Sequence, residues 1–284
     1  MKIAESELIL NKDGSVYHLT LLPEDIADTI ITVGDPERVP MVTKYFDKIE
    51  IQKSNREFVT HTGYLGNKKV SVIATGIGTD NIDIVLNELD ALVNIDLKAR
   101  TPKKQLKSLN IIRIGTSGAL QNDIPIDSFL VSEYAVGLEG LLHFYQYQNA
   151  HNKINNAVSK ITNTESYTTQ ADTYLLDKLA KGIKRGITLT APGFYAPQGR
   201  QLRLQPKQKD FIDTLSALKF EDNLQITNLE METSGIYGLG SLLGHRCISF
   251  NAMIANRQLG TFSSNAEQTI DELISFVLEN IKHL

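Results

Sequence analysis

The chain has 284 residues, which suits one large α/β domain or two small ones, and its apolar fraction of 42% excludes a disordered chain. Its 29 Lys and Arg residues and 33 Asp and Glu residues give a formal net charge of −4. A surface this close to neutral gives no general attraction to nucleic acid or to anionic membranes, so we predict neither as a partner.

Cysteine usage and the apolar runs indicate the compartment. The single cysteine, Cys247, cannot form an internal disulfide and lies in an apolar stretch, which predicts a small buried residue rather than a nucleophile. Residues 1–7 lack the apolar core of a signal peptide, and no continuous apolar run is long enough to cross a bilayer. We therefore expect a soluble protein in the reducing environment of the cytoplasm.

Strands and helices alternate along the chain. Runs rich in Ile, Val and Thr predict buried strands at residues 30–33, 70–74, 111–114, 129–132, 187–189 and 247–255. Helical apolar spacing follows at residues 81–93, 174–179, 209–218 and 270–281. Ser264 and Glu267 have capping-box spacing before the last helix. This alternation predicts an open, largely parallel sheet wrapped by helices.

Two polar segments interrupt this pattern. Residues 98–107 are basic, and residues 146–170 are rich in Asn, Gln, Ser and Thr. We expect each to form a surface insertion, either a solvated loop or a loosely packed helix. The chain has no internal repeat and no convincing linker, so we predict one domain over residues 1–284.

Two glycine-bearing segments directly follow predicted strands, where α/β sheets bind their ligands. Residues 34–38 (GDPER) offer backbone N–H groups and Arg38 to an anion, but on local sequence an ordinary strand-to-helix turn with Asp35 as cap is the simpler explanation. Residues 75–79 (TGIGT) lack the third glycine of a dinucleotide fingerprint and are typical of a tight turn.

Arg113 lies inside an apolar strand, where an unpaired guanidinium costs free energy. It therefore needs a carboxylate or an anionic ligand as partner. In residues 113–119 (RIGTSGA), the hydroxyls of Thr116 and Ser117 and the N–H groups between the glycines supply further donors. A structural salt bridge and an anion site both explain this pattern.

Two later segments offer groups for a nucleoside. In residues 194–200 (FYAPQGR), Gln198 donates and accepts while Arg200 only donates, a pair that fits the edge of a pyrimidine, with Phe194 stacking on its ring. In residues 230–235 (EMETSG), a glutamate can hold ribose hydroxyls. A polar surface loop and a solvated helix start are the alternatives. The six histidines show no metal-ligand spacing, so we predict no metal.

In this order, the segments resemble the nucleoside phosphorylase family of the uridine phosphorylase type, from about Tyr17 to the C-terminal helix. The resemblance implies a three-layer α/β/α sandwich around a mixed, mostly parallel sheet. It implies a pentosyltransferase of nucleoside salvage that splits uridine or a related pyrimidine nucleoside into uracil and ribose 1-phosphate. Inorganic phosphate is then a co-substrate, and no cofactor is needed.

The resemblance also assigns a role to individual residues. The phosphate-binding set is Gly34, Arg38, Arg56, Arg113 and Thr116. The ribose-binding set is His18, Thr116, Met231 and Glu232. The base-binding set is Gly118, Phe194, Gln198, Arg200, Ile254 and Ala255. Among these, the residues expected to act in catalysis are Arg113, Gln198 and Arg200.

The same resemblance implies an oligomer. Arg56 and His18 match residues that reach into the site of a neighbouring subunit, so a homodimer would be the smallest active unit, and family members are often hexamers.

Some positions depart from the family pattern: Gly199 stands where bacterial enzymes carry glutamate. Some members bind potassium near the interface. Glu57 fits one of its ligands, but Asn81 stands where serine is expected, so we do not assign an ion.

Three alternative functions follow from the same residues. A purine nucleoside phosphorylase of this fold typically has an aspartate at the position of Asn256, and its absence favours a pyrimidine. A nucleosidase, which uses water, lacks the full set of arginines matched here by Arg38, Arg56 and Arg113. A non-catalytic nucleoside-binding protein would bind through the same residues without turnover.

Overall fold

Aliphatic and β-branched residues build the middle of the sheet in the computed structural model, which describes residues 2–284. β1 (Thr29–Val33) is buried at every position and pairs in parallel with β4 (Lys68–Ala74) and β7 (Asn110–Ala119). β12 (Arg246–Asn256) continues this parallel ladder on the other side of β7. The carboxyl ends of these four strands therefore lie at one edge of the sheet.

A second group of strands closes part of the sheet on itself. β8 (Phe129–Gly137) and β11 (Ile226–Glu230) lie in parallel on either side of β10 (Lys184–Thr190). β8 then pairs antiparallel with β12, and β11 pairs antiparallel with β7. The mixed sheet is as predicted, but the prediction of an open sheet is wrong, because β12, β8, β10, β11 and β7 form a closed ring.

Six further strands, which the sequence patterns did not reveal, lie outside the parallel ladder and the ring. The hairpin of β2 (Lys48–Asn55) and β3 (Phe58–Leu65) adds to β4, and its outer strand is polar, which hides the pattern of a strand. The remaining short strands are β5 (Ile95–Asp96), β6 (Thr101–Pro102), β9 (Tyr167–Gln170) and β13 (Thr261–Phe262). Of these, β9 pairs with β8 and β13 with β12.

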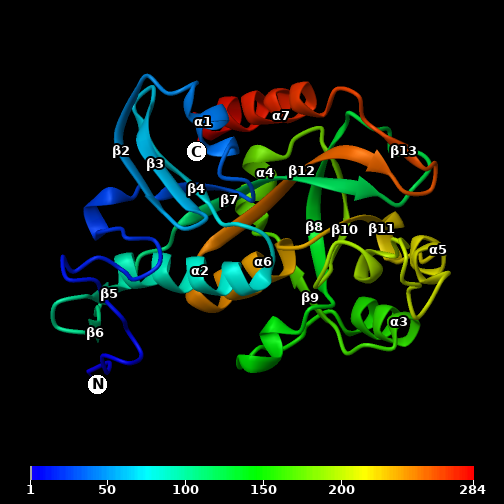
Figure 1. Cartoon of the computed structure of the whole chain (residues 1–284), viewed down its shortest axis with the longest axis horizontal. Coiled ribbons are helices and arrows are strands. Elements are labelled where there is room, and N and C mark those ends of the chain that lie inside the picture. Colours follow the sequence, from blue (N-terminus) through cyan, green and yellow to red (C-terminus); the bar gives the residue numbers. More distant parts are fainter. Residues whose placement is uncertain (1) are drawn as a thin grey trace.

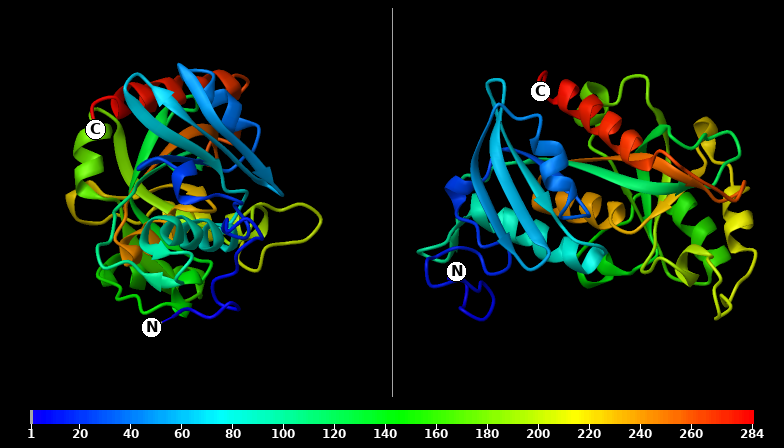
Figure 2. Two further views of the ribbon diagram at one scale, coloured as in Figure 1. Left: turned by 90° about the vertical axis from the view of Figure 1, so that its left-hand side faces the viewer. Right: turned by 45° about the horizontal axis from the view of Figure 1, so that its top comes forward.

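Helices cover both faces of the sheet, which gives the three layers implied by the resemblance (Figures 1 and 2). One layer holds α2 (Thr79–Asn94) and α6 (Thr233–Leu243), which pack on each other. The opposite layer holds α1 (Arg38–Thr43), α4 (Thr173–Leu179) and α7 (Ala266–Ile281). At the end of the strand ring, α3 (Asn152–Thr162) lies against α5 (Phe211–Ser216). The 3₁₀ turns are Pro23–Asp25, Leu141–Phe144, Ala196–Gln198 and Glu221–Asn223.

Glycines allow α6 to approach its neighbours closely. A Cβ at Gly238 would lie 2.1 Å from a methyl group of Leu142, and one at Gly240 would lie 2.2 Å from the sulfur of Cys247. Cys247 is itself buried, as predicted, and burial raises the pKa of its thiol. This close packing holds α6, whose first residue directly follows Glu232, against the rest of the fold.

The two insertions and the last helix differ in how well they were predicted. Residues 102–108 are exposed around the small β5–β6 hairpin, as a surface insertion requires. Residues 146–170 are not peripheral, because Val158 of α3 and Tyr167 of β9 are buried. The capping box is wrong: α7 begins after Asn265 without a side-chain cap. Within residues 2–284, no helix is long and apolar enough to span a membrane.

The Tyr237 hydroxyl links α6 to two strands of the ring. It donates to the backbone oxygen of Ser132 at 2.7 Å and accepts from the backbone N–H of Ser249 at 2.8 Å. We expect Tyr237→Phe to lower the free energy of unfolding by about 2 kcal/mol, because two buried backbone groups lose their partner. Urea denaturation measures this change. Tyr45→Phe, at an exposed hydroxyl, is the control, and an equal loss in both variants would contradict the expectation.

Candidate functional site

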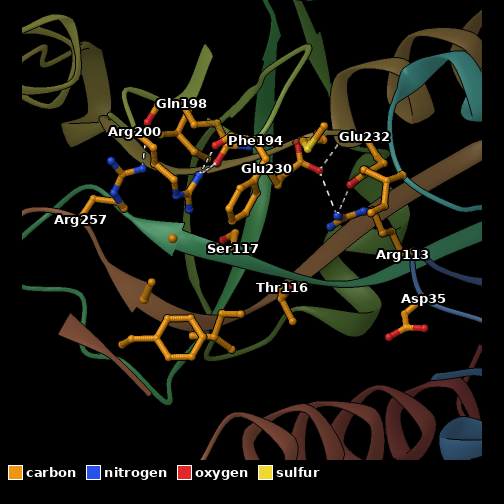
Figure 3. A pocket seen from close by; sticks show the side chains of 18 of the residues that line it. Asp35, Arg113, Thr116, Ser117, Phe194, Gln198, Arg200, Glu230, Glu232 and Arg257 are labelled. Carbon is orange, nitrogen blue, oxygen red and sulfur yellow. Dashed lines mark hydrogen bonds and ion pairs between the residues drawn. The ribbon is translucent and has the colours of Figure 1, made fainter. Parts of the chain in front are cut away.

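One cavity of about 830 Å³ lies where the ends of the central strands meet the start of α6. Gly34 follows β1, Gly76 follows β4, and Phe194 lies beyond β10. The last residues of β7 and β12 form one wall, and the segment after β11 forms another. Figure 3 shows how the side chains from these separate strands face the same space. The closed ring of strands thus brings distant parts of the sequence together.

Arg113 is the most buried cation of this cavity, with 5% of its surface exposed. Its side chain runs forward along its own strand over Gly115, where a Cβ would lie 1.9 Å from Nη1. Nη2 donates to Oε2 of Glu232 at 2.6 Å and lies 3.2 Å from Oε2 of Glu230. The salt bridge left open by the sequence therefore exists, and it lies in the wall of a cavity.

Burial and the neighbouring charges shift the pKa of Arg113 in opposite directions. Burial alone would lower the pKa of Arg113, but the two nearby glutamates outweigh it and raise that pKa. Burial raises the pKa of Glu232, and Glu230 adds repulsion, while Arg113 acts in the opposite direction. The cation and the carboxylates are thus stable in the interior only as a group.

Glu230 is held by hydrogen bonds at the start of α6. Its carboxylate accepts from the backbone N–H groups of Glu232 and Thr233, at 3.0 and 2.9 Å, and from the hydroxyls of Thr233 and Thr190, at 2.9 and 2.7 Å. Oε1 of Glu232 accepts from the N–H of Gly78 at 2.8 Å, which ties it to the loop after β4. The alternative of a solvated helix start is therefore wrong.

Arg38 is the second cation at this end of the cavity. Asp35 caps the preceding turn by accepting from the N–H of Glu37 at 2.9 Å, so the strand-to-helix turn is real. In the described part of the chain, Arg38 forms no salt bridge with a carboxylate. Burial, and then repulsion from Arg113, lower its pKa. An anion placed between Arg38 and Arg113 would relieve that repulsion.

The opposite end of the cavity holds two more guanidinium groups. Arg200 lies 3.7 Å from the centre of the Phe194 ring, and its Nη1 donates to Oε1 of Gln198 at 2.5 Å. Burial, and then repulsion from Arg257, lower the pKa of Arg200 to about 10. Because Oε1 of Gln198 accepts from Arg200, its Nε2 hydrogens are oriented away from that bond, and Gln198 is buried. The alternative of a polar surface loop is thus wrong for Gln198.

The turn at Gly199 needs glycine. Its φ is +67°, and a Cβ there would lie 2.5 Å from a carbon of Ile212 on α5. Its backbone oxygen lies 3.4 Å from Nη2 of Arg257, whose Nη1 donates to the oxygen of Gln198 at 2.9 Å. A glutamate at position 199, as in the bacterial pattern, would require a different turn.

Most of the predicted site residues line this one cavity. They are Gly34, Arg38, Arg113, Thr116, Gly118, Phe194, Gln198, Arg200, Met231, Glu232, Ile254 and Ala255. His18 and Arg56 do not line it. They lie near each other, since the Asn55 side chain donates to the backbone oxygen of His18 at 2.9 Å. His18 pairs with Glu88 at 2.7 Å, and Arg56 is exposed with its guanidinium over Tyr17.

Other lining residues lie outside the predicted site sets, and three of them make contacts that explain their place. Arg257 supports the Gln198 loop, and its only signal is a charge directly after a long apolar strand. Glu230 was quoted in its motif without a role. Ser117 accepts from the amide of Asn228 at 2.9 Å, inside the sheet. Each gains its place from contacts between strands, which the spacing of a sequence does not show.

Comparisons with known proteins agree with this geometry. Residues 28–282 match the model of the Phosphorylase superfamily. A uridine phosphorylase of Thermococcus kodakarensis is 29% identical over 94% of this chain and 87% of its own length. A purine nucleoside phosphorylase of the DeoD type from Buchnera aphidicola is 23% identical over 94% and 99%. A Trypanosoma brucei nucleoside phosphorylase, described as showing uridine phosphorylase activity, superposes with a TM-score of 0.87 at 28% identity, covering 98% of this chain and all of that one.

The ion cluster predicts a pH-dependent defect when its cation is removed. Arg113→Met leaves two buried carboxylates without a counter-charge, which lowers the free energy of unfolding by about 3–5 kcal/mol near neutral pH. The pKa of Glu232 is already raised in the folded protein and rises further in the variant. The folded variant then binds protons that the unfolded chain has lost, so its stability increases as the pH falls toward 5.

Urea denaturation of the variant at pH 5 and pH 8 measures this difference. Lys153→Met is the matched control, because it removes a cation from an ion pair that is 82% exposed at both side chains and should change stability little at either pH. A loss in Arg113→Met that is the same at both pH values would show that the glutamates are not under electrostatic strain.

Proposed function

The chain belongs to the phosphorylase superfamily, and on this premise we propose that it is an enzyme that cleaves uridine or a related pyrimidine nucleoside with inorganic phosphate. The products are the free base and ribose 1-phosphate. The observation that carries the proposal is one cavity with Arg38 and Arg113 at one end and Gln198 and Arg200 at the other. The names of the relatives point to the same reaction.

Phosphate occupies the end of the cavity between Arg38 and Arg113. The N–H group of Gly34 and the hydroxyl of Thr116 supply further donors there. Buried Arg113 and half-buried Arg38 repel each other and so favour a dianion over water. A fixed phosphate converts a bimolecular attack into a step within one complex. Arg113, whose Nη2 is engaged by the two glutamates, contributes mainly through its charge.

Ribose lies over the middle of the cavity. Glu232 is fixed by Gly78 and Arg113, and its oxygens can still accept from the sugar hydroxyls. Met231, next to it, lines the cavity and can pack against the sugar ring. The glycosidic bond breaks with its electron pair on the base, and a phosphate oxygen forms the new bond to the anomeric carbon. No covalent intermediate with the protein is needed.

The base lies at the end that holds Gln198 and Arg200. The negative charge that builds on the departing base is stabilised there by the Arg200 guanidinium and by the Nε2 hydrogens of Gln198. Ile254 and Ala255 at the end of β12 provide the apolar wall. The cations at both ends of the cavity thus match the two places where negative charge lies during the reaction.

The position of Asn256 favours a pyrimidine over a purine. Its Nδ2 donates to the backbone oxygens of Gln121 and Ile124, both at 2.9 Å, and its Oδ1 accepts from the N–H groups of Gln258 and Leu259, both at 3.0 Å. All of its hydrogen-bonding groups therefore serve the backbone. The residue at this position supports a loop and has no group left for protonating a purine ring.

The subunit arrangement is part of the same proposal. His18 and Arg56 lie side by side outside the cavity of their own chain, as residues donated to a neighbouring subunit would. Glu57, next to Arg56, lines the cavity, so the tip of the β2–β3 hairpin lies at its mouth. A homodimer is then the smallest active unit, and a hexamer is an assembly of three dimers.

A panel of nucleosides incubated with and without phosphate tests the reaction. We expect uracil and ribose 1-phosphate from uridine only when phosphate is present. Release of base without phosphate would identify a nucleosidase, and faster turnover of inosine or adenosine would identify a purine enzyme. Tight binding of uridine with no turnover in either buffer would leave only a binding protein.

Gln198→Ala tests the base-reading role. Loss of this buried donor and acceptor raises the KM for uridine by about tenfold or more. The KM for phosphate changes little, because Gln198 lies at the opposite end of the cavity from Arg38 and Arg113. Steady-state kinetics with each substrate varied in turn separates the two values. Equal loss of affinity for both substrates would indicate damaged folding rather than a role in reading the base.

A further inference from the structure

Asn251 contacts the buried cation of the site without lining the cavity. It lies on β12 opposite Gly115 of β7, over which the Arg113 side chain runs. Its Oδ1 accepts from Nη1 of Arg113 at 3.1 Å, whereas the hydroxyl of Ser249 is a longer second partner at 3.4 Å. Asn251 is fully buried, so this contact is not exchanged for one with water.

A chain of buried hydrogen bonds fixes the orientation of the Asn251 amide. Its Nδ2 donates to Ser132 at 3.1 Å, and Ser132 is 2.5 Å from the hydroxyl of Thr188. Thr188 in turn donates to Oδ1 of Asn228 at 2.9 Å, so the hydrogen between Ser132 and Thr188 must come from Ser132. Asn228 then donates to Ser117. Every donor points from Arg113 toward Ser117, and the amide of Asn251 cannot flip without breaking the chain.

The charge of residue 251 matters as much as its shape. Arg113 already faces two carboxylates, those of Glu230 and Glu232, and Arg38 is the other nearby cation. The four charges sum to zero, and a neutral acceptor at position 251 keeps that sum. A third carboxylate there would hold the guanidinium more tightly and make this end of the cavity repel an anion.

We propose that Asn251 is a positioning residue for phosphate, because it holds Nη1 of Arg113 while the glutamates hold Nη2, and so fixes the guanidinium in the cavity wall. This inference rests on the proposed function. The gain is preorganisation: the guanidinium enters the complex with its orientation already set, and phosphate binding does not have to order it. Ser132 contributes indirectly, because its hydroxyl orients the Asn251 amide.

Asn251→Ala should raise the KM for phosphate by about tenfold, the effect of losing one hydrogen bond to a charged group, while the KM for uridine stays within about twofold. Asn251→Asp should weaken phosphate binding more than Asn251→Ala, because it adds a negative charge. Ser132→Ala removes only the group that orients the amide and should raise the KM for phosphate by about fivefold. This variant tests the inference even if those at position 251 do not fold.

Asn94→Ala is the control for simple destabilisation. Asn94 is also buried, and its amide bonds to Asp90 and to the backbone of Lys107, away from the cavity. It should lower the melting temperature without changing either KM. The rise in melting temperature of each variant as inorganic phosphate is added gives a second measure of phosphate affinity, and this measure does not need turnover.

The outcomes separate this inference from the proposed function. If the wild-type protein neither binds phosphate nor needs it for cleavage, the proposed function and this inference both fail. If the wild type needs phosphate but Asn251→Ala, or a folded Ser132→Ala, binds it as tightly, only the role of Asn251 is overturned. The role of Asn251 would also be overturned if the KM for phosphate and the KM for uridine rose equally in each variant, and rose most in the variants with the lowest melting temperatures.

Discussion

The mutual burial of Arg113, Glu230 and Glu232 is the constraint on which the rest of the site depends. A guanidinium with 5% of its surface exposed costs free energy without a counter-charge, and two neighbouring buried carboxylates repel each other unless a cation lies between them. Arg113 comes from β7, Glu230 ends β11 and Glu232 follows it, so the ion cluster forms only when these strands pair. The same contacts that close the strand ring therefore build one end of the cavity.

Two pairs of arginines, one at each end of the cavity, suit a reaction in which negative charge lies at both ends. Arg38 and Arg113 face each other near the carboxylates, and Arg200 and Arg257 lie at the far end. Each pair repels internally, which lowers the pKa of Arg38 and of Arg200 in addition to burial. Bound negative charge relieves that repulsion at each end, so phosphate and a departing base both meet preorganised cations.

The sequence predicted the parts that depend on local patterns. All six apolar strands form, and Arg113 stood out because a charge inside an apolar strand needs a partner. The sequence did not predict contacts between strands. The closed ring, the exact partners of Arg113 and the role of Asn251 all depend on the register of the strands. The outer strand of the β2–β3 hairpin was missed because it is mostly polar. The buried face of α3 was missed because the many polar residues around Ile154 and Val158 hid their helical spacing. The placement of His18 and Arg56 in a partner's site stays a prediction.

A crystal structure of the protein with inorganic phosphate tests the central claim most directly. We predict that the oxyanion lies between Arg38 and Arg113, near Gly34 and Thr116, with Asn251 and the glutamates still in contact with the Arg113 guanidinium. Phosphate bound only elsewhere, or Arg38 turned away from an anion while Arg113 remains enclosed by its glutamates, would contradict the account.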